Sequence, residues 1–505
     1  MPTFKIIYLP PLLIYASAGV SGITSVVGIF FIKDFLNLSA AFVASIGFWA
    51  GIPWALKMPI GFLIDKYWNL KQYFVYLGAI LISFSLIIMY CILAHKSFMI
   101  SYLDIKIWFI ISSILTPIGY VLQDVVADAM TVEAVEPNLK KKSQVSVKKE
   151  HTMLQLYGRF AIIFGALLVG IINLYIFKGV GQNHTNINLL YAKVYLFALI
   201  IPLISVSGVF LFNFFNTNTR TVTFKTNKLD YQIFTGSCIF VFFTVLIGSL
   251  KIPFSREIVL LSSLVLISIL MHLLIKELNQ EERYTIVGTA VIIFVFRSMP
   301  GPGVGLNWFE IDILGFNQSF FSILSITSAS ITLIGIIALR KVMINSSIAK
   351  LFLVLSVLST VLYLPNLFMF YDLHLITSRL TSGVVDAKFI AILNTAAESP
   401  LSQVAMIPLL AWIAKNAPTR YKATFFAVFA SFTNIALSAR ELFTSYLNKI
   451  FIINREVKDS DTGTILENAN YDNLDNLLIS IMLITFFVPL LTIFLIQKSK
   501  FKSTE

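Results

Sequence analysis

The sequence predicts an all-α protein that crosses a membrane many times. Of its 505 residues, 57% are hydrophobic and 13% are charged, whereas a soluble domain carries about 25% charged residues. The mean hydropathy is +0.84. Apolar runs of the length that a spanning helix needs, about 20 residues, recur along the whole chain. We therefore expect the lipid bilayer, and not a soluble core, to cover most of the apolar surface.

Fourteen apolar runs qualify as spans, and they fall into groups of six, two and six. The first six lie at 7–32, 40–63, 72–94, 107–133, 152–177 and 192–215. Two shorter runs follow at 232–250 and 257–275, and the last six lie at 285–309, 319–339, 349–370, 383–413, 423–448 and 475–497. The sequence thus predicts an N-terminal six-helix bundle over 1–215, a cytoplasmic linker with an inserted helical hairpin over 216–283, and a C-terminal six-helix bundle over 284–505. Two such bundles are the build of the major facilitator superfamily; if the pair at 232–275 is only partly inserted, twelve true spans remain.

The loop charges predict the orientation. The net charge is +12, and Lys and Arg residues concentrate in short loops between the apolar runs. With cytoplasmic N- and C-termini, the inner loops hold about twice as many Lys and Arg residues as the outer loops, as the positive-inside rule requires. We therefore assign this charge to orientation and not to nucleic-acid binding, and expect an integral multi-pass protein of the plasma (cell inner) membrane.

Several charged residues fall inside the predicted spans, where a charge is costly and usually faces a polar cavity. Asp124 and Asp128 are four residues apart and so share one helix face. Arg159, on the next antiparallel run, lies at a similar depth, so an Asp128–Arg159 ion pair is expected. This group is either a structural tie between two helices or a site that couples protons or binds substrate.

Three further intramembrane charges are candidates for the same passage. Lys57 either extends its stem toward the headgroups or binds an anion. Arg297 lies near the bilayer centre and is followed by Pro-Gly-Pro-Gly at 300–303, which predicts a kinked or unwound helix. Broken helices of this kind hold substrate sites in transporters. Glu398 lies in the second bundle at the place that corresponds to Asp124 and Asp128.

Three stretches carry a family resemblance. They are GIPWALKMPIGFLIDK at 51–66, QDVVADAMTVE at 123–133 and PTRYKATFFAVFASFTN at 418–434, and in this order they resemble segments of the folate–biopterin transporter family. The resemblance implies a major-facilitator carrier that moves folate or a pterin by alternating access, coupled to protons. It also places Asp65 and Lys66 at the superfamily's gating position, although Tyr-Trp-Asn at 67–69 departs from the usual loop motif.

The sequence lacks the motifs of an enzyme. It has no GxxxxGK[ST] loop, no HExxH and no Cys/His cluster, so we predict no catalytic residues, no metal and no cofactor. The predicted function is secondary active transport of a small polar solute, with protons as the coupling ion. Two alternatives stay open: a carrier for another anionic metabolite, and a carrier-like assembly or sensor protein that moves nothing.

Overall fold

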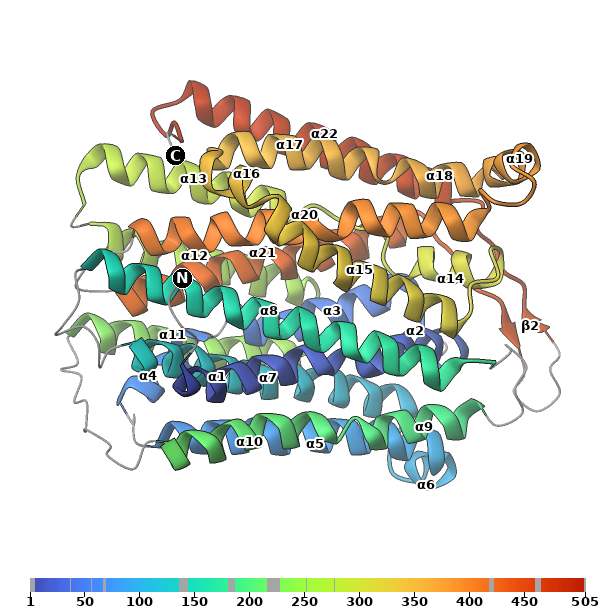
Figure 1. The fold of residues 1–505 in the computed structure, drawn as a ribbon, viewed down its shortest axis with the longest axis horizontal. Helices are drawn as coiled ribbons and strands as arrows, with labels where there is room; N and C mark the ends of the chain where they lie inside the picture. Colours follow the sequence, from blue (N-terminus) through green and yellow to red (C-terminus); the bar gives the residue numbers. More distant parts are fainter. Residues whose placement is uncertain are drawn as a thin grey trace. The chain divides into compact units, whose positions relative to one another are not determined.

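The chain is helical apart from one short two-stranded sheet in the part that the computed structural model describes (Figure 1). That part comprises residues 5–36, 38–55, 57–66, 70–135, 144–179, 187–215, 228–250, 252–276, 278–416, 422–458 and 465–503. The chain divides into two compact units: unit 1 is Met1–Gly28 with Leu56–Ser237, and unit 2 is Ile29–Ala55 with Cys238–Glu505.

Unit 1 consists of helices from the first half of the sequence. They are η1 (Ile6–Tyr8), α1 (Leu9–Val20), η2 (Ser21–Thr24), α4 (Lys57–Lys66), α5 (Lys71–Ala94), α6 (Lys96–Ile100), α7 (Ile105–Val135), α8 (Gln144–Phe177), α9 (Ile187–Phe197) and α10 (Ile200–Phe215). Two helices are divided between the units, α2 (Ser25–Asp34) and α11 (Lys228–Ser249).

Unit 2 combines one early helix, α3 (Ala40–Ala55), with the second half of the sequence. Its other elements are α12 (Ser255–Ile275), α13 (Gln280–Arg297), α14 (Val304–Asp312), α15 (Gln318–Ala338), α16 (Arg340–Asn345), α17 (Ile348–Val361), α18 (Leu364–Phe370), α19 (Leu373–Leu380), α20 (Ala387–Asn416), α21 (Lys422–Ile450), β1 (Val457–Lys458), β2 (Ile465–Glu467) and α22 (Leu474–Lys498). The strands β1 and β2 pair antiparallel.

Glycines let the helices of unit 1 approach closely. α5 and α7 pack along each other, and a Cβ on Gly78 of α5 would lie 2.5 Å from the backbone oxygen of Gly119 on α7. Small residues serve this purpose in membrane proteins, where packing and not hydrophobic exclusion holds helices together. α1 packs against α7, α8 and α10, and α10 lies beside α5 (Figure 1). The result places α1 and α7 next to each other, which brings their polar residues within reach.

In unit 2, the ninth predicted span is interrupted as expected. α13 ends at Arg297, α14 begins at Val304, and Gly303 has a φ of +67°. The freed backbone groups find partners on α21: Thr444 Oγ1 accepts from the Gly301 N–H at 3.0 Å, and Asn448 donates to the Pro302 carbonyl at 3.3 Å. Irregular backbone at membrane depth persists only with such partners, so the predicted break after Arg297 is confirmed.

A polar network centred on Asp312 joins α2, α14 and the loop before α22 in unit 2. Lys33 lies 2.6 Å from one Asp312 carboxylate oxygen, while the Tyr471 hydroxyl donates to the other at 2.6 Å and the Glu456 N–H at 3.1 Å. Lys33 also lies 3.3 Å from Asp34. Burial raises the pKa of Tyr471 well above its usual range, and the hydrogen bond to Asp312 adds to the shift. The tyrosine therefore stays a donor at neutral pH.

Arg455 completes this network from the same loop. Its guanidinium donates to the carbonyls of Leu36 at 2.8 Å and Leu38 at 3.0 Å, and lies 5.2 Å from the ring centre of Trp308. Burial lowers the pKa of Arg455, and the charge of Asp34 acts in the opposite direction. The segment that follows α2 is thus held by an arginine that comes more than 400 positions later in the sequence.

The helices agree with the predicted class, while the number of spans stays a prediction. Each of the fourteen apolar runs contains at least one helix among the described residues. Nine described helices or helix pairs are long and apolar enough to cross a membrane, and Ala40–Trp54 and Phe234–Gly248 are shorter apolar helices. The bundle boundaries at 215 and 284 and the cytoplasmic placement of both termini likewise remain predictions.

Candidate functional site

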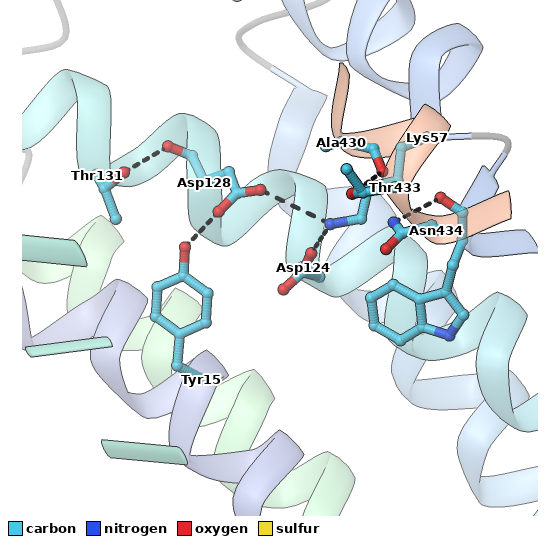
Figure 2. Close-up of polar contacts among 9 residues, drawn as sticks. Tyr15, Lys57, Asp124, Asp128, Thr131, Ala430, Thr433 and Asn434 are labelled. Carbon is cyan, nitrogen blue, oxygen red and sulfur yellow. Dashed lines mark hydrogen bonds and ion pairs between the residues drawn. The ribbon is translucent and has the colours of Figure 1, made fainter. Parts of the chain in front are cut away.

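Three of the predicted site residues meet in unit 1. Figure 2 shows Lys57 of α4 between Asp124 and Asp128 of α7. The Lys57 ammonium donates a hydrogen bond to Asp124 Oδ2, and lies 3.9 Å from Asp128 Oδ2. The two aspartates face the same partner because residues four apart lie one above the other on a helix. One cation is therefore shared, unequally, by two carboxylates.

Tyr15 of α1 is the fourth member of this cluster, and the sequence did not single it out. Its hydroxyl donates to Asp128 Oδ1 at 2.5 Å (Figure 2). The ring is packed against α8, because a Cβ on Gly158 would lie 2.9 Å from two of its carbons. A tyrosine in an apolar run usually serves in packing or in an interface belt. The sequence around Tyr15 therefore does not predict that its hydroxyl contacts a carboxylate on another helix.

Arg159 does not form the predicted ion pair. Among the described residues, the cation within 4 Å of Asp128 is Lys57, and Arg159 acts on Tyr15, Lys57 and Asp128 through its charge alone. The reason lies in the packing: α8 packs mainly against α1, whereas α4 lies against α7. Equal depth along two helices was therefore not enough to identify the partner, and the expected pair with Asp128 is wrong.

The surroundings of the cluster are apolar. Tyr15 belongs to a buried core that includes Ile64, Val126, Ala127 and Leu154. It lies about a third of the way along the candidate span Ile6–Asp34. Yet the side chain of Asp128 keeps 39% of its surface accessible, against 24% for Asp124 and 14% for Lys57. Asp128 is thus the most exposed of these three side chains.

The other candidate residues lie in unit 2. Arg297, the last residue of α13, donates from Nε to the Thr433 carbonyl of α21 at 3.1 Å and lies 3.7 Å from the Met406 sulfur. Glu398 of α20 interacts through its charge with Arg440 and with Glu310 of α14. Glu310 was missed by the sequence, although it follows the helix break. Arg297 therefore ties two helices, while Glu398 belongs to a separate group of charges.

The two predicted gating residues close α4. Asp65 and Lys66 are its last residues, and their side chains lie outside the described part of the chain. Their gating role stays a prediction.

The three sequence stretches are also places where helices join. Lys57 of the first stretch contacts Asp124 of the second, and Asn434 of the third donates to the carbonyl of Trp54 in the first at 3.1 Å (Figure 2). Residues that satisfy buried charge and backbone groups are needed by any carrier of this build. These contacts therefore show that the three stretches help to hold helices together.

Comparison with solved structures shows the fold. A POT family transporter in complex with 5-aminolevulinic acid aligns with a TM-score of 0.66 at 14% identity, over 99% of this chain and 96% of that one. A POT family transporter in complex with a thioalcohol-conjugated peptide gives 0.64 at 14% identity, over 99% and 96%. A mutant peptide transporter POT in complex with sulfate gives 0.63 at 13% identity, over 98% and 94%. The chain therefore has the all-helical fold that these transporters share.

Comparison with family models and with curated sequences shows which family the chain belongs to. A search of curated protein sequences finds no significant match, whereas a model of the BT1 family matches residues 18–504. The BT1 model thus covers nearly the whole chain, while the POT transporter structures, at 13–14% identity, show the fold. The relatives by fold are transporters and not enzymes. By the match over nearly its whole length, the chain belongs to the BT1 family.

Proposed function

We propose that this protein is a secondary transporter that moves a small charged solute across a membrane by alternating access, coupled to protons. The observation that carries the proposal is the group of Lys57, Asp124 and Asp128, placed together inside a bundle of apolar helices. Charges at such depth are tolerated where they face a polar passage. A carboxylate that faces water within such a passage can take up a proton on one side and release it on the other.

The solute we propose is peptide-like, with an amine and a carboxylate. POT transporters of the same fold are in complex with 5-aminolevulinic acid and with a conjugated peptide, and both ligands are small organic molecules with polar ends. The charged side chains of this chain suit such a solute in kind, because Arg297 can pair with a carboxylate and Glu398 with an ammonium group.

The proposal includes the architecture of transport. Residues 1–215 and 284–505 are proposed as two six-helix halves that open alternately to either side, joined by a linker with a two-helix hairpin at 216–283, fourteen spans in all. Both termini are proposed to lie in the cytoplasm, and Asp65 and Lys66 to act as a gate. The support is the 6 + 2 + 6 pattern of apolar runs and the distribution of loop charges.

Uptake into proteoliposomes tests the proposal. The purified protein is reconstituted, and uptake of radiolabelled 5-aminolevulinic acid and of a radiolabelled dipeptide is measured with and without an inward proton gradient. We expect the gradient to drive accumulation and a protonophore to abolish it. Uptake no greater than in protein-free vesicles, for both solutes, would refute the proposed transport of peptide-like compounds.

A matched pair of lysine variants links uptake to the site. Lys57→Met should abolish gradient-driven accumulation, because two carboxylates then lose their shared cation. Lys106→Met, at an exposed position at the start of α7, should transport like the unmodified protein. If Lys57→Met and Lys106→Met both transport like the unmodified protein, the lysine–aspartate cluster is not required for transport.

A further inference from the structure

The two aspartates of α7 have unequal partners. Asp124 accepts a hydrogen bond from the Lys57 ammonium, whereas Asp128 lies 3.9 Å from it, beyond hydrogen-bonding distance. Hydrogen bonds between ionised groups are about twice as strong as those between neutral groups. Asp124 is thus the carboxylate that forms the charge-assisted hydrogen bond with Lys57, and Asp128 lies farther from this cation.

Tyr15 gives Asp128 a different kind of partner. Its hydroxyl donates to Oδ1 at 2.5 Å, and a phenol can donate to the carbonyl oxygen of a carboxylic acid as well as to a carboxylate. Oδ2 points toward Lys57 and is free of Tyr15. A proton can therefore bind to Oδ2 without breaking the hydrogen bond that orients the side chain.

The charges around Asp128 come from four helices. Tyr15 faces it from α1, Lys57 from α4 and Asp124 from α7 itself, while Arg159 acts on it from α8. When Asp128 is ionised, its charge and that of Asp124 are together offset by the two cations. When Asp128 is protonated, the pair of Lys57 and Asp124 is left intact. The charge of the cluster can thus change by one unit without dismantling it.

We propose that Asp128 is the group that carries the coupling proton, that Asp124 is the permanent counter-ion of Lys57, and that Tyr15 is a positioning residue for Asp128. This inference rests on the proposed function. Uptake of the proton adds one hydrogen to Asp128 Oδ2 from water on one side, and release returns it to water on the other. No bond of the solute is made or broken.

The experiment separates movement of solute from movement of protons. Proteoliposomes loaded with unlabelled 5-aminolevulinic acid exchange it for external labelled solute without net proton flow, and a proton gradient drives accumulation in a second assay. Asp128→Asn should exchange within about twofold of the unmodified protein and lose gradient-driven accumulation, because the amide cannot take up and release the coupling proton. Asp124→Asn should lose both activities, because Lys57 loses the negative charge that offsets its own.

The control for both variants is Asp372→Asn. Asp372 is exposed and has a φ of +58°, a conformation that Asn tolerates, so both activities should persist. Proton-driven accumulation by Asp128→Asn, or coupled accumulation by Asp124→Asn, would overturn the assignment. If the unmodified protein exchanges solute and never responds to a gradient, the proton coupling of the proposed function fails instead.

Tyr15→Phe keeps both carboxylates, so we expect this variant to fold even if the aspartate variants do not. It should transport, with an altered pH profile of accumulation, because Asp128 loses the hydroxyl that positions it. Tyr175→Phe, at a position that is 83% exposed, should leave the profile unchanged. An unaltered profile for Tyr15→Phe would overturn the positioning role.

Discussion

The clusters around Asp128 in unit 1 and Asp312 in unit 2 have the same composition, one lysine between two aspartates and a tyrosine that donates to one of them. They differ in how fully the carboxylate is occupied. Asp312 has Lys33 on one oxygen and two donors on the other, and its side chain is 8% exposed. Asp128 has one close donor and a distant lysine, and is 39% exposed.

This difference separates a structural carboxylate from one that can change its charge. Protonation of Asp312 would weaken three interactions at once in a site that water hardly reaches. Protonation of Asp128 leaves its hydrogen bond to Tyr15 and the Lys57–Asp124 pair in place. Of these two carboxylates, Asp128 is therefore the one that we propose as functional, because it has fewer close partners and is more exposed.

The largest expected effect is on stability, from Asp312→Ala. The substitution leaves the buried ammonium of Lys33 without its closer partner and removes the acceptor of Tyr471. Breaking a buried ion pair from one side costs about 3 kcal/mol or more. The change in the free energy of unfolding is measured in detergent micelles, with heat or denaturant to unfold the protein and Asp372→Asn as the control. Equal stability of the two variants would show that the Asp312 network is no tighter than a surface site.

Arg455→Met should cost somewhat less. The arginine donates to the carbonyls of Leu36 and Leu38, and methionine leaves both acceptors buried without it. Hydrogen bonds from a charged group contribute about 2 kcal/mol each, part of which new packing of the methionine offsets. The same unfolding assay applies, with Arg379→Met at an exposed position of α19 as the control. A loss no greater than that of the control would contradict the anchoring role.

Gly158→Ala sharpens the comparison at the other cluster. The added methyl group would lie 2.9 Å from the Tyr15 ring, so the ring must move relative to Asp128. We expect a loss of about 1 kcal/mol from overpacking, and a pH profile of transport that changes as in Tyr15→Phe. Gly28→Ala, where no neighbour lies within 4 Å, is the matched control. An unchanged profile in Gly158→Ala would mean that α8 does not position the tyrosine.

The sequence could predict what each helix carries, and less of what each helix meets. Charges at span depth single out Lys57, Asp124 and Asp128, and the Pro-Gly repeat after Arg297 correctly predicts a broken helix. These signals are local, since each depends on a residue and its neighbours along one helix.

The partners depend on helix packing, which periodicity does not specify. By depth alone Asp128 could pair with Arg159, whereas its approach to Lys57 depends on how α4 packs along α7. Tyr15 and Arg455 bind groups more than 100 and 400 positions away. The packing of α3 along α21 could not be predicted either, because an apolar helix face does not identify the helix that packs against it.

The smallest expected effect is the pH dependence that Tyr471 gives to the Asp312 network. Its pKa is raised in the folded protein by burial and by the hydrogen bond to Asp312, above the value of about 10 in an unfolded chain. Folding therefore holds the proton more tightly, so this contribution to stability is full below about pH 10 and is lost as the pH rises further. Tyr471→Phe should be less stable than the unmodified protein at pH 7, and the difference should narrow at pH 11. The melting temperatures of both proteins at the two pH values measure this difference, with Tyr175→Phe as the control. If the difference in melting temperature stays constant or widens at pH 11, the Tyr471 proton does not contribute to the stability of the network.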